Sequence, residues 1–263
     1  MWRDAAPAIC RSMPATPAWP PASLPRLFVD QQLALGTSIA IEGGQAHYLA
    51  GVMRLREGDH VRLFDDATGE WIATIAQVGK RALTLTVTEQ LAQREAVPDL
   101  WLLAAPIKKG RIDWVAEKAC ELGVDRLRPV LTRRTVVDRL NLDRLRAHMI
   151  EAAEQCGRTA LPALDEPVKL TALLRDWPAN RALFFADESG AGIAMIDAVR
   201  AHPGRAAILI GPEGGFDPDE AEAIRACSAA IGVSLGPRIL RAETAAAAAV
   251  TLWMAGAGDW GVR

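Results

Sequence analysis

The periodicity of hydrophobic residues changes near residue 96, and this change restricts the fold more than any other feature of the sequence. In residues 81–90, Leu83, Leu85 and Val87 alternate with threonines. This two-residue period is typical of half-buried β-strands. Further strands are expected at 61–64 and 71–78, with glycine-containing turns between them and one helical stretch at 45–53. We therefore expect a small β-barrel domain over residues 26–95.

After a linker at residues 96–99, apolar strands alternate with amphipathic helices. Gly123 and Gly157 are typical helix stops, and Asp217-Pro218 is a typical helix start. This order predicts an α/β domain over residues 96–263, with a mostly parallel sheet covered by helices on both faces. The expected strands lie at 100–105, 127–131, 182–186, 206–210 and before 235; the expected helices lie at 111–122, 142–156, 217–227 and 243–254.

The first 25 residues have a different composition from the rest of the chain. They contain six prolines, which disfavour both helix and sheet. We expect residues 1–25 to form a flexible extension.

Charge is distributed unevenly along the chain. The formal net charge is −2, yet residues 101–150 carry 11 Lys/Arg against 6 Asp/Glu, and residues 151–263 carry 10 against 15. A local basic segment of this kind attracts phosphate, so contact with a nucleic acid is expected from residues 101–150. The alternative is a solvated helical face.

Several classes of protein are disfavoured by the sequence. None of the four cysteines lies in a CxxC pair and the four histidines are scattered, so no metal site and no disulfide framework are expected. This cysteine usage suits the reducing cytoplasm. The longest apolar run, residues 245–258, is too short to span a bilayer, and the N-terminus does not resemble a signal peptide.

Two glycine-containing loops follow expected strands in the last third of the chain. They read Gly-Pro-Glu-Gly-Gly-Phe at 211–216 and Leu-Gly-Pro-Arg-Ile-Leu-Arg-Ala-Glu-Thr at 235–244. Ligands of open α/β sheets bind beyond the carboxyl ends of the strands, where glycine lets the backbone approach closely. Motifs of P-loop and dinucleotide sites are absent, and Glu213 suits a cationic or hydroxyl-rich ligand. Each loop alone could be an ordinary turn, with Glu243 a helix-dipole residue and Arg241 part of a surface ion pair.

Together, these loops resemble the signature loops of the RsmE-type ribosomal RNA methyltransferases of the SPOUT superfamily. Lys109-Gly110 and residues 118–124 are similar to the family's KG…KATELGV segment, and residues 151–158 to its EAAEQSxR segment. Residues 26–29, 47–54 and 58–59 look like its PUA-like domain. The resemblance spans residues 26–255. The chain differs at residues 132–135 (Thr-Arg-Arg-Thr for Thr-Glu-Arg-Ser), at Glu117 (for Gln) and at Cys156 (for Ser).

The resemblance implies a catalytic domain with a C-terminal trefoil knot and S-adenosyl-L-methionine bound in a bent form by the two loops. It further implies a homodimer that acts on 16S rRNA of the small ribosomal subunit and produces N3-methyluridine. No metal and no membrane are implied, and the expected location is the cytoplasm.

The resemblance and the chemistry of methyl transfer assign roles to individual residues. Removal of the N3 proton of uracil requires stabilisation of the developing anion, which is expected from Arg241 and from Arg158 of the partner subunit. The expected cofactor contacts are Gly211, Pro212, Glu213, Gly214, Leu235, Gly236, Ile239 and Leu240. The expected contacts with RNA phosphate are Arg26, Lys109, Arg111, Arg133, Arg134 and Arg158.

Three alternatives remain at this point. The first is a related knotted methyltransferase that acts on a ribose hydroxyl or on tRNA. The second is a non-catalytic RNA-binding assembly factor. The third is a small-molecule α/β enzyme, for which the barrel and the basic segment would be incidental.

Overall fold

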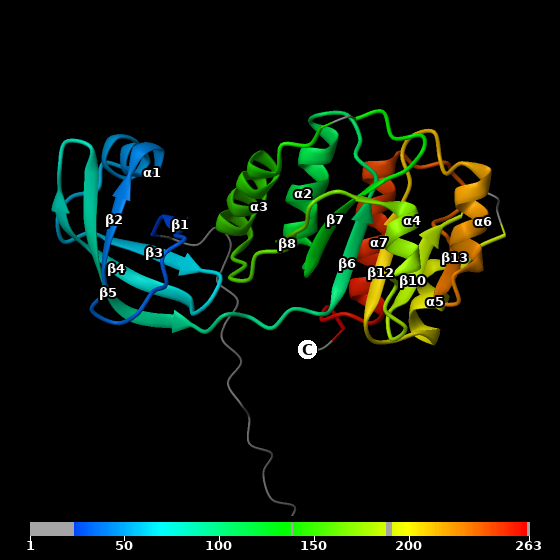
Figure 1. Cartoon of the computed structure of the whole chain (residues 1–263). Coiled ribbons are helices and arrows are strands. Elements are labelled where there is room, and N and C mark those ends of the chain that lie inside the picture. The colour runs from blue at the N-terminus through cyan, green and yellow to red at the C-terminus, as the bar shows by residue number, and fades with distance from the viewer. Residues whose placement is uncertain (1–23, 138, 188–190, 262–263) are drawn as a thin grey trace, which may run out of the picture.

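The computed structural model describes residues 24–137, 139–187 and 191–261. Residues 1–23 of the expected extension lie outside the described residues. Figure 1 shows two parts: a curled antiparallel sheet at the left and a helix-covered parallel sheet at the right. The change in hydrophobic periodicity near residue 96 therefore coincides with the passage from the curled sheet to the parallel sheet.

The first part is a curled five-stranded sheet in the order β1-β3-β4-β5-β2. The pair β1 and β3 is parallel and the other pairs are antiparallel. No ladder joins β1 to β2 within the described residues, so the sheet is a half-barrel. Leu83, Leu85 and Val87 are at most 1% exposed, as their alternation predicts. The elements are β1 (Arg26–Phe28), β2 (Ser38–Glu42), α1 (Gly43–His47), the π-helix η1 (Tyr48–Val52), β3 (His60–Asp65), β4 (Gly69–Val78) and β5 (Ala82–Ala92).

The second part is an eight-stranded sheet in which β11-β13-β10-β12-β6-β7-β8 are neighbours and β9 also pairs with β7. All of its recorded strand pairs are parallel. The strands are β6 (Leu100–Ala104), β7 (Arg126–Leu131), β8 (Ala163–Leu164), β9 (Val168–Lys169), β10 (Ala182–Ala186), β11 (Ile193–Ala194), β12 (Ala206–Ile210) and β13 (Ala230–Ser234). The predicted parallel sheet is confirmed.

Helices cover both faces of this sheet. Leu102 and Ile208 point into one core, which includes residues of α2, α3, α5 and α7, whereas Leu103 and Leu209 point into a second core with residues of α4 and α6. Strands buried on both faces read as continuous apolar runs, which is the pattern seen in the sequence. The helices are α2 (Arg111–Glu121), α3 (Leu142–Cys156), α4 (Leu170–Arg175), α5 (Met195–Ala201), α6 (Pro218–Ala226) and α7 (Ala242–Gly256).

A polar junction connects the half-barrel to the end of α3. The Arg26 guanidinium pairs with Glu70 and donates to the carbonyl oxygens of Ala153 and Arg158, the latter at 2.8 Å. Across the same junction, the N–H of Phe28 donates to Glu154 Oε1 at 3.0 Å. The three hydrogen bonds to α3 and to Arg158 join residues more than 120 positions apart, so both parts contribute to one interface.

Glu95, the residue just before the expected linker, and Asp66 are also held at this junction. Glu95 Oε1 accepts hydrogen bonds from the N–H groups of Thr159 at 2.6 Å and Ala160 at 3.0 Å. The side chain of Asp66 accepts the N–H of Leu161 at 2.9 Å. These two carboxylates therefore anchor the half-barrel to the segment after α3, directly before the expected linker at residues 96–99.

Arg158 closes the end of α2 from inside the protein. Gly123 has a φ of +91°, and Val124 N–H donates to Ala119 O at 2.9 Å, which is the Schellman arrangement of a helix end. The Arg158 guanidinium donates to Cys120 O and Val124 O, both at 2.7 Å. The side chain thus adds donors to one carbonyl in the last turn of α2 and to one just beyond the helix end, where the helix dipole favours positive charge.

Candidate functional site

Four loops leave the parallel sheet at the same edge, because all of their strands run in one direction. They follow β6 (residues 105–110), β7 (132–137 and 139–141), β12 (211–217) and β13 (235–241). The N–H of Ala105 donates to Ile210 O at 3.0 Å, so the first and third loops start side by side. This carboxyl edge is where open α/β sheets bind ligands, and we refer to these four loops as the loop edge.

The loop at 211–217 has a firm base and an exposed tip. Pro212 is buried, and its carbonyl accepts the N–H of Gly215 at 2.9 Å in a turn that gives Gly215 a φ of +66°. Glu213 and Gly214 are exposed at the tip. The backbone of the tip is therefore available to a ligand.

The loop at 235–241 presents apolar groups to the outside. Ile239 is fully exposed, whereas Leu235 and Leu240 are half-buried and pack against the core. Gly236 has a φ of +108°, which only glycine adopts readily. Arg241 is exposed at the N-cap of α7. The exposed Ile239 therefore adds apolar surface to this edge of the sheet.

Arg111, the first residue of α2, joins the two glycine-containing loops electrostatically. Its Nη1 lies 3.4 Å from Glu213 Oε1 and its Nε lies 3.5 Å from Glu243 Oε1. Glu213 belongs to the loop after β12, and Glu243 lies in the first turn of α7 after the second loop. One guanidinium therefore holds a carboxylate from each side of the candidate site.

The second oxygen of Glu243 is left without a hydrogen bond by the part of the chain that the structure describes. Its Oε2 is buried and makes no hydrogen bond among the described residues. A buried acceptor without a donor costs roughly 1–3 kcal/mol, so this atom is an available acceptor for a donor from a ligand or from water. Sequence analysis recognised Glu243 only through its position at a helix N-terminus, because its partner Arg111 lies 132 residues earlier.

Two of the predicted RNA-binding arginines hold the loop at 211–217 from the side. Arg134 Nη1 donates to Gly214 O at 2.7 Å, and Arg133 Nη1 lies 2.6 Å from both Asp217 and Asp219. These carboxylates raise the pKa of Arg133, with the hydrogen bond to Asp219 the largest cause. The two side chains therefore contact the protein as well as solvent.

Glu220 completes this attachment, and sequence analysis did not select it. It is 5% exposed, and its Oε1 accepts the N–H of Arg133 at 2.8 Å. Its Oε2 accepts the N–H of Asp217 at 3.2 Å. The Asp-Pro-Asp-Glu spacing of a capping box was the available signal.

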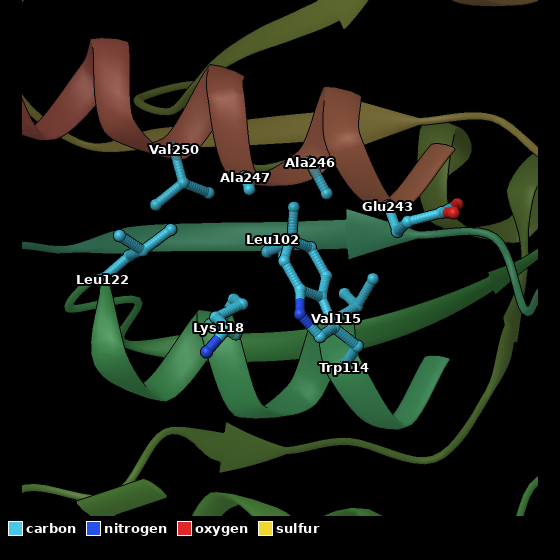
Figure 2. A pocket seen from close by; sticks show the side chains of 10 residues that line it. Leu102, Trp114, Val115, Lys118, Leu122, Glu243, Ala246, Ala247 and Val250 are labelled. Carbon is cyan, nitrogen blue, oxygen red and sulfur yellow. The ribbon is translucent and has the colours of Figure 1, made fainter. Parts of the chain in front are cut away.

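A groove between α2 and α7 leads away from the loop edge. Figure 2 shows it with Leu102 of β6 beneath, Trp114 and Leu122 on α2, and Val250 on α7. Glu243 lies at one end of the groove, and Trp114 is 37% exposed. The groove is thus continuous with the candidate site and has mostly apolar walls.

Two predicted site residues lie elsewhere. Arg26 and Arg158 are 8% and 5% exposed, and their guanidinium groups are bonded at the junction described above. This burial is inconsistent with the predicted contacts of both residues with RNA phosphate and with the predicted catalytic role of Arg158. The sequence shows the charge of an arginine but not the buried carbonyl groups that it satisfies.

The basic segment is largely neutralised by the fold. Arg126 and Arg128 both pair with Asp165, Arg144 pairs with Asp113, and Arg146 pairs with Asp30. Of these acidic partners, Asp165 and Asp30 lie outside residues 101–150, so part of the excess positive charge of the segment is paired with acidic residues from elsewhere in the chain. Of the predicted phosphate contacts, Lys109 is exposed in the loop before α2.

The described part of the chain contains no cluster of three or more His, Cys, Asp or Glu side chains suited to a metal ion. Among the same residues, no helix has the length and apolar character required to cross a bilayer.

Family comparisons agree with the two-part architecture. A family model described as an RNA methyltransferase domain matches residues 93–254, and one described as an RNA methyltransferase PUA domain matches residues 41–88. The first match covers more than half of the chain. The half-barrel is therefore PUA-like, as expected.

Solved structures with the same fold include complexes with a cofactor. A putative methyltransferase from Legionella pneumophila, in complex with SAM, has a TM-score of 0.81 and 28% identity, and the match covers 90% of this chain and 99% of that one. Ribosomal RNA small subunit methyltransferase E from Neisseria gonorrhoeae, bound to S-adenosyl methionine, has a TM-score of 0.80 and 25% identity, and covers 90% and 100%.

Curated relatives carry the same name. Ribosomal RNA small subunit methyltransferase E of Rickettsia conorii is 31% identical over 86% of this chain and 93% of its own length. The protein of that name from Mycobacterium bovis is 28% identical over 88% and 94%. The fold, the loop edge and these matches agree with the resemblance seen in the motifs, and the chain belongs to the ribosomal RNA small subunit methyltransferase E family.

Proposed function

We propose that this protein transfers a methyl group from S-adenosyl-L-methionine to N3 of a uridine in 16S rRNA. The names of its relatives support an activity on small-subunit rRNA, and two similar structures contain S-adenosylmethionine. The observation that carries the proposal is the loop edge. There, two glycine-containing loops present backbone and apolar groups beside Glu243, whose Oε2 has no donor among the described residues.

The residues of the loop edge fit this cofactor chemically. S-adenosylmethionine carries hydroxyl and ammonium donors, and Glu243 Oε2 and the exposed Glu213 are acceptors for such groups. Ile239, Leu235 and Leu240 supply apolar surface for a flat base. We therefore assign cofactor contact to Gly211, Pro212, Glu213, Gly214, Leu235, Gly236, Ile239 and Leu240.

Arg241 is the residue that we assign to the chemistry of the acceptor base. The cofactor, when bound, supplies an electrophilic methyl group on a sulfonium. The N3 proton of uracil must leave, and a nearby guanidinium favours the anionic base. Arg241 is exposed at the end of the second loop, and the positive end of the α7 dipole adds to its charge.

RNA binding is assigned to exposed groups at the same edge. Lys109 is exposed, and Arg111, Arg133 and Arg134 lie around the loop at 211–217. We propose that residues 26–95 form the RNA-binding domain and residues 96–263 the catalytic domain. A trefoil knot around the two cofactor loops is part of the same proposal, as is a cytoplasmic location.

A homodimer is proposed through the outer face of α7. Thr244, Ala247, Ala248 and Thr251 are exposed or half-buried on this helix, and none of them is charged. A solvent-facing helix normally carries charged residues on its outer face. The groove beside Trp114 continues this surface, and a second copy of the chain would cover both. Light scattering should give a dimer mass for the protein and a monomer mass for Ala247→Arg; a monomeric parent protein would contradict the assignment.

Labelled cofactor tests the activity directly. We expect transfer of label to 16S rRNA or to small subunits, with N3-methyluridine as the product in nucleoside mass spectrometry. Label in a 2′-O-methylated nucleoside or in tRNA would favour a related knotted methyltransferase instead. Failure to bind S-adenosylmethionine in calorimetry would favour a non-catalytic assembly factor.

Gly214→Val is the matched variant for this experiment. A Cβ at Gly214 would lie 3.6 Å from Arg134 Cδ, which is an ordinary van der Waals distance, so the fold should tolerate it. The larger side chain would occupy the exposed tip of the loop. We expect loss of cofactor binding with an unchanged unfolding midpoint.

A further inference from the structure

A groove lies in the half-barrel between the helical segment α1-η1 and the turn that joins β4 to β5. Its volume is about 790 Å³. In the β2–β5 ladder Glu42 lies opposite Ala82, and the turn is closed by a 2.9 Å hydrogen bond from Gly79 N–H to Ala82 O. This register brings the tip of the turn beside the start of α1. The groove is lined by Glu42, His47, Gly51, Lys80 and Arg81, among others.

The wall formed by α1 and η1 combines small residues with one aromatic ring. Ala46, Ala50 and Gly51 line the groove and carry no atoms beyond Cβ. A Cβ at Gly51 would lie 3.0 Å from both Cε1 and Nδ1 of His47, so the imidazole ring lies directly over bare backbone. His47 is exposed. A flat ring beside small residues leaves room for a planar group to stack on it.

The opposite wall carries two cations that are available to a ligand. Lys80 and Arg81 are exposed, and neither makes a salt bridge or a side-chain hydrogen bond with any of the described residues. Arg126 and Arg128 of the basic segment differ, because both pair with Asp165. Lys80 and Arg81 are therefore suited to bind phosphate.

Glu42 adds a carboxylate to the same groove. It is exposed, and it too forms no ion pair within the described part of the chain. An ionised carboxylate accepts hydrogen bonds but cannot donate them. The ligand that matches this groove combines negative charge, a flat ring and a hydrogen-bond donor, and a nucleotide has all three.

We propose that this groove binds one unpaired nucleotide of the RNA substrate and that Glu42 selects its base. The proposal rests on the proposed activity on rRNA and adds a second contact with the RNA, apart from the loop edge. Lys80 and Arg81 bind the phosphate, His47 stacks on the base, and Glu42 accepts hydrogen bonds from the base edge. The nucleotide is unpaired, because a base within an RNA helix exposes neither its face nor its pairing edge.

The carboxylate of Glu42 distinguishes the four bases by their pairing edges. Guanine presents N1–H and an amino group side by side, and these match the two oxygens of a carboxylate. Cytosine and adenine present an amino group next to an acceptor nitrogen. Uracil presents carbonyl oxygens on both sides of its N–H, and these oxygens repel a carboxylate. We therefore expect guanine to bind best and uracil least well.

Fluorescence anisotropy with short single-stranded RNAs tests the selection of the base. The reference is oligouridine, and the test strands carry one guanosine, cytidine or adenosine at the centre. The full-length protein should bind the guanosine strand roughly ten-fold more tightly than oligouridine, as expected for one bidentate contact with a base edge. Glu42→Gln should abolish this preference. Equal affinity of the parent protein for all the strands would overturn the role of Glu42.

The salt dependence of RNA binding tests the two cations. Lys80→Ala combined with Arg81→Ala removes two contacts with single-stranded phosphate, so the slope of log Kd against log salt concentration should become shallower by about 1.4. Arg175→Ala combined with Arg200→Ala is the matched control, since both residues are exposed on helices of the second part and the net charge changes equally. Equal slopes for the two double variants would overturn the assignment of the phosphate.

Calorimetry with S-adenosylmethionine separates this proposal from the proposed function. The groove variants change no residue of the loop edge, so each should bind the cofactor as the parent protein does. A parent protein that methylates rRNA, with RNA affinity unchanged in the groove variants, would contradict the groove alone. A parent protein that binds RNA through the groove but transfers no methyl group would contradict the proposed function alone.

Discussion

The junction between the two parts and the loop edge of the parallel sheet use arginine in opposite ways. At the junction, Arg26 and Arg158 are buried and their guanidinium groups satisfy backbone carbonyls. At the loop edge, Arg111, Arg134 and Arg241 are at least partly exposed and lie among loops that contain exposed glycine and isoleucine. The first group is needed to fold the protein, and the second is available to a ligand.

The difference shows that partners, not charge, decide the role of an arginine. A buried guanidinium is tolerated only where acceptors surround it, and removal of one member of such a network leaves buried groups without partners. An exposed arginine contributes little to stability, so its value lies in what it can bind. Variants of the two groups should therefore differ in which measurement they change.

The largest effect is expected for Arg158→Ala. Loss of the guanidinium leaves the carbonyls of Cys120 and Val124 without this donor at the buried end of α2. We expect unfolding in urea to show a loss of about 3 kcal/mol. Arg241→Ala at the loop edge is the control and should change stability by less than about 0.5 kcal/mol. Equal losses in the two variants would remove the distinction between the regions.

The second largest effect is expected for the methylation rate of the Arg241→Ala variant. Removal of a charge that stabilises the developing uracil anion should slow single-turnover methylation by roughly 100-fold. The loss should diminish at high pH, where the base ionises without assistance. Arg238→Ala, on the same loop, is the matched control. An unchanged rate for Arg241→Ala at every pH would exclude the assigned role.

A smaller effect is expected for Arg134→Ala. This change removes the hydrogen bond to Gly214 O that holds the loop tip. The loss should be about 1 kcal/mol, or roughly five-fold in the affinity for S-adenosylmethionine by calorimetry. Arg175→Ala is a suitable control, since Arg175 is exposed and pairs with its neighbour Asp176. The interpretation fails if both variants bind the cofactor equally.

The smallest effect is expected for the pH dependence of stability at the junction. Burial raises the pKa of Glu154, although the N–H of Phe28 and the charge of Arg26 oppose this. The folded protein therefore binds this proton more tightly, and its stability falls as pH rises from about 4.3, the ordinary value, through the raised pKa. Glu154→Gln removes this dependence, so its stability relative to the parent should increase with pH across that window.

Asp65 provides a comparison with Glu154, because its pKa is shifted in the opposite direction. Burial alone would raise its pKa, but the N–H groups of Leu33, Thr68 and Ala67 lower it overall. Its stabilising contribution is present above the ordinary aspartate pKa and is lost as pH falls through the lowered value. The loss of stability caused by Asp65→Asn should therefore become smaller as the pH falls into the acidic range. Parallel pH profiles for the two variants would show that the burial and hydrogen-bond arguments do not distinguish them.

Much of the fold could be predicted from local patterns in the sequence. The period-two alternation around Leu85 locates β5, and the glycines at 123 and 157 end α2 and α3 where expected. Short elements such as β8, β9 and β11 were missed, because two residues carry no periodicity. Helix α4 and helix α5 are also short, and their patterns are correspondingly weak.

The site was less accessible to sequence analysis than the fold. Glycine at 214 and 236 indicated loops with approachable backbone, since this property belongs to the residue itself. The contacts of Arg111 with Glu213 and Glu243, and the burial of Arg158, depend on groups far away in the chain. No local pattern encodes such a pair, so the roles of these charged residues required the folded structure.

The contacts of Arg26 have a consequence for the order of events during synthesis on the ribosome. Arg26 lies in the first strand of the half-barrel, but two of its acceptors belong to Ala153 and Arg158. All the strands of the half-barrel have left the ribosome before these carbonyls exist. In the nascent half-barrel, the Arg26 guanidinium therefore remains hydrated until the end of α3 emerges and supplies these two carbonyl groups.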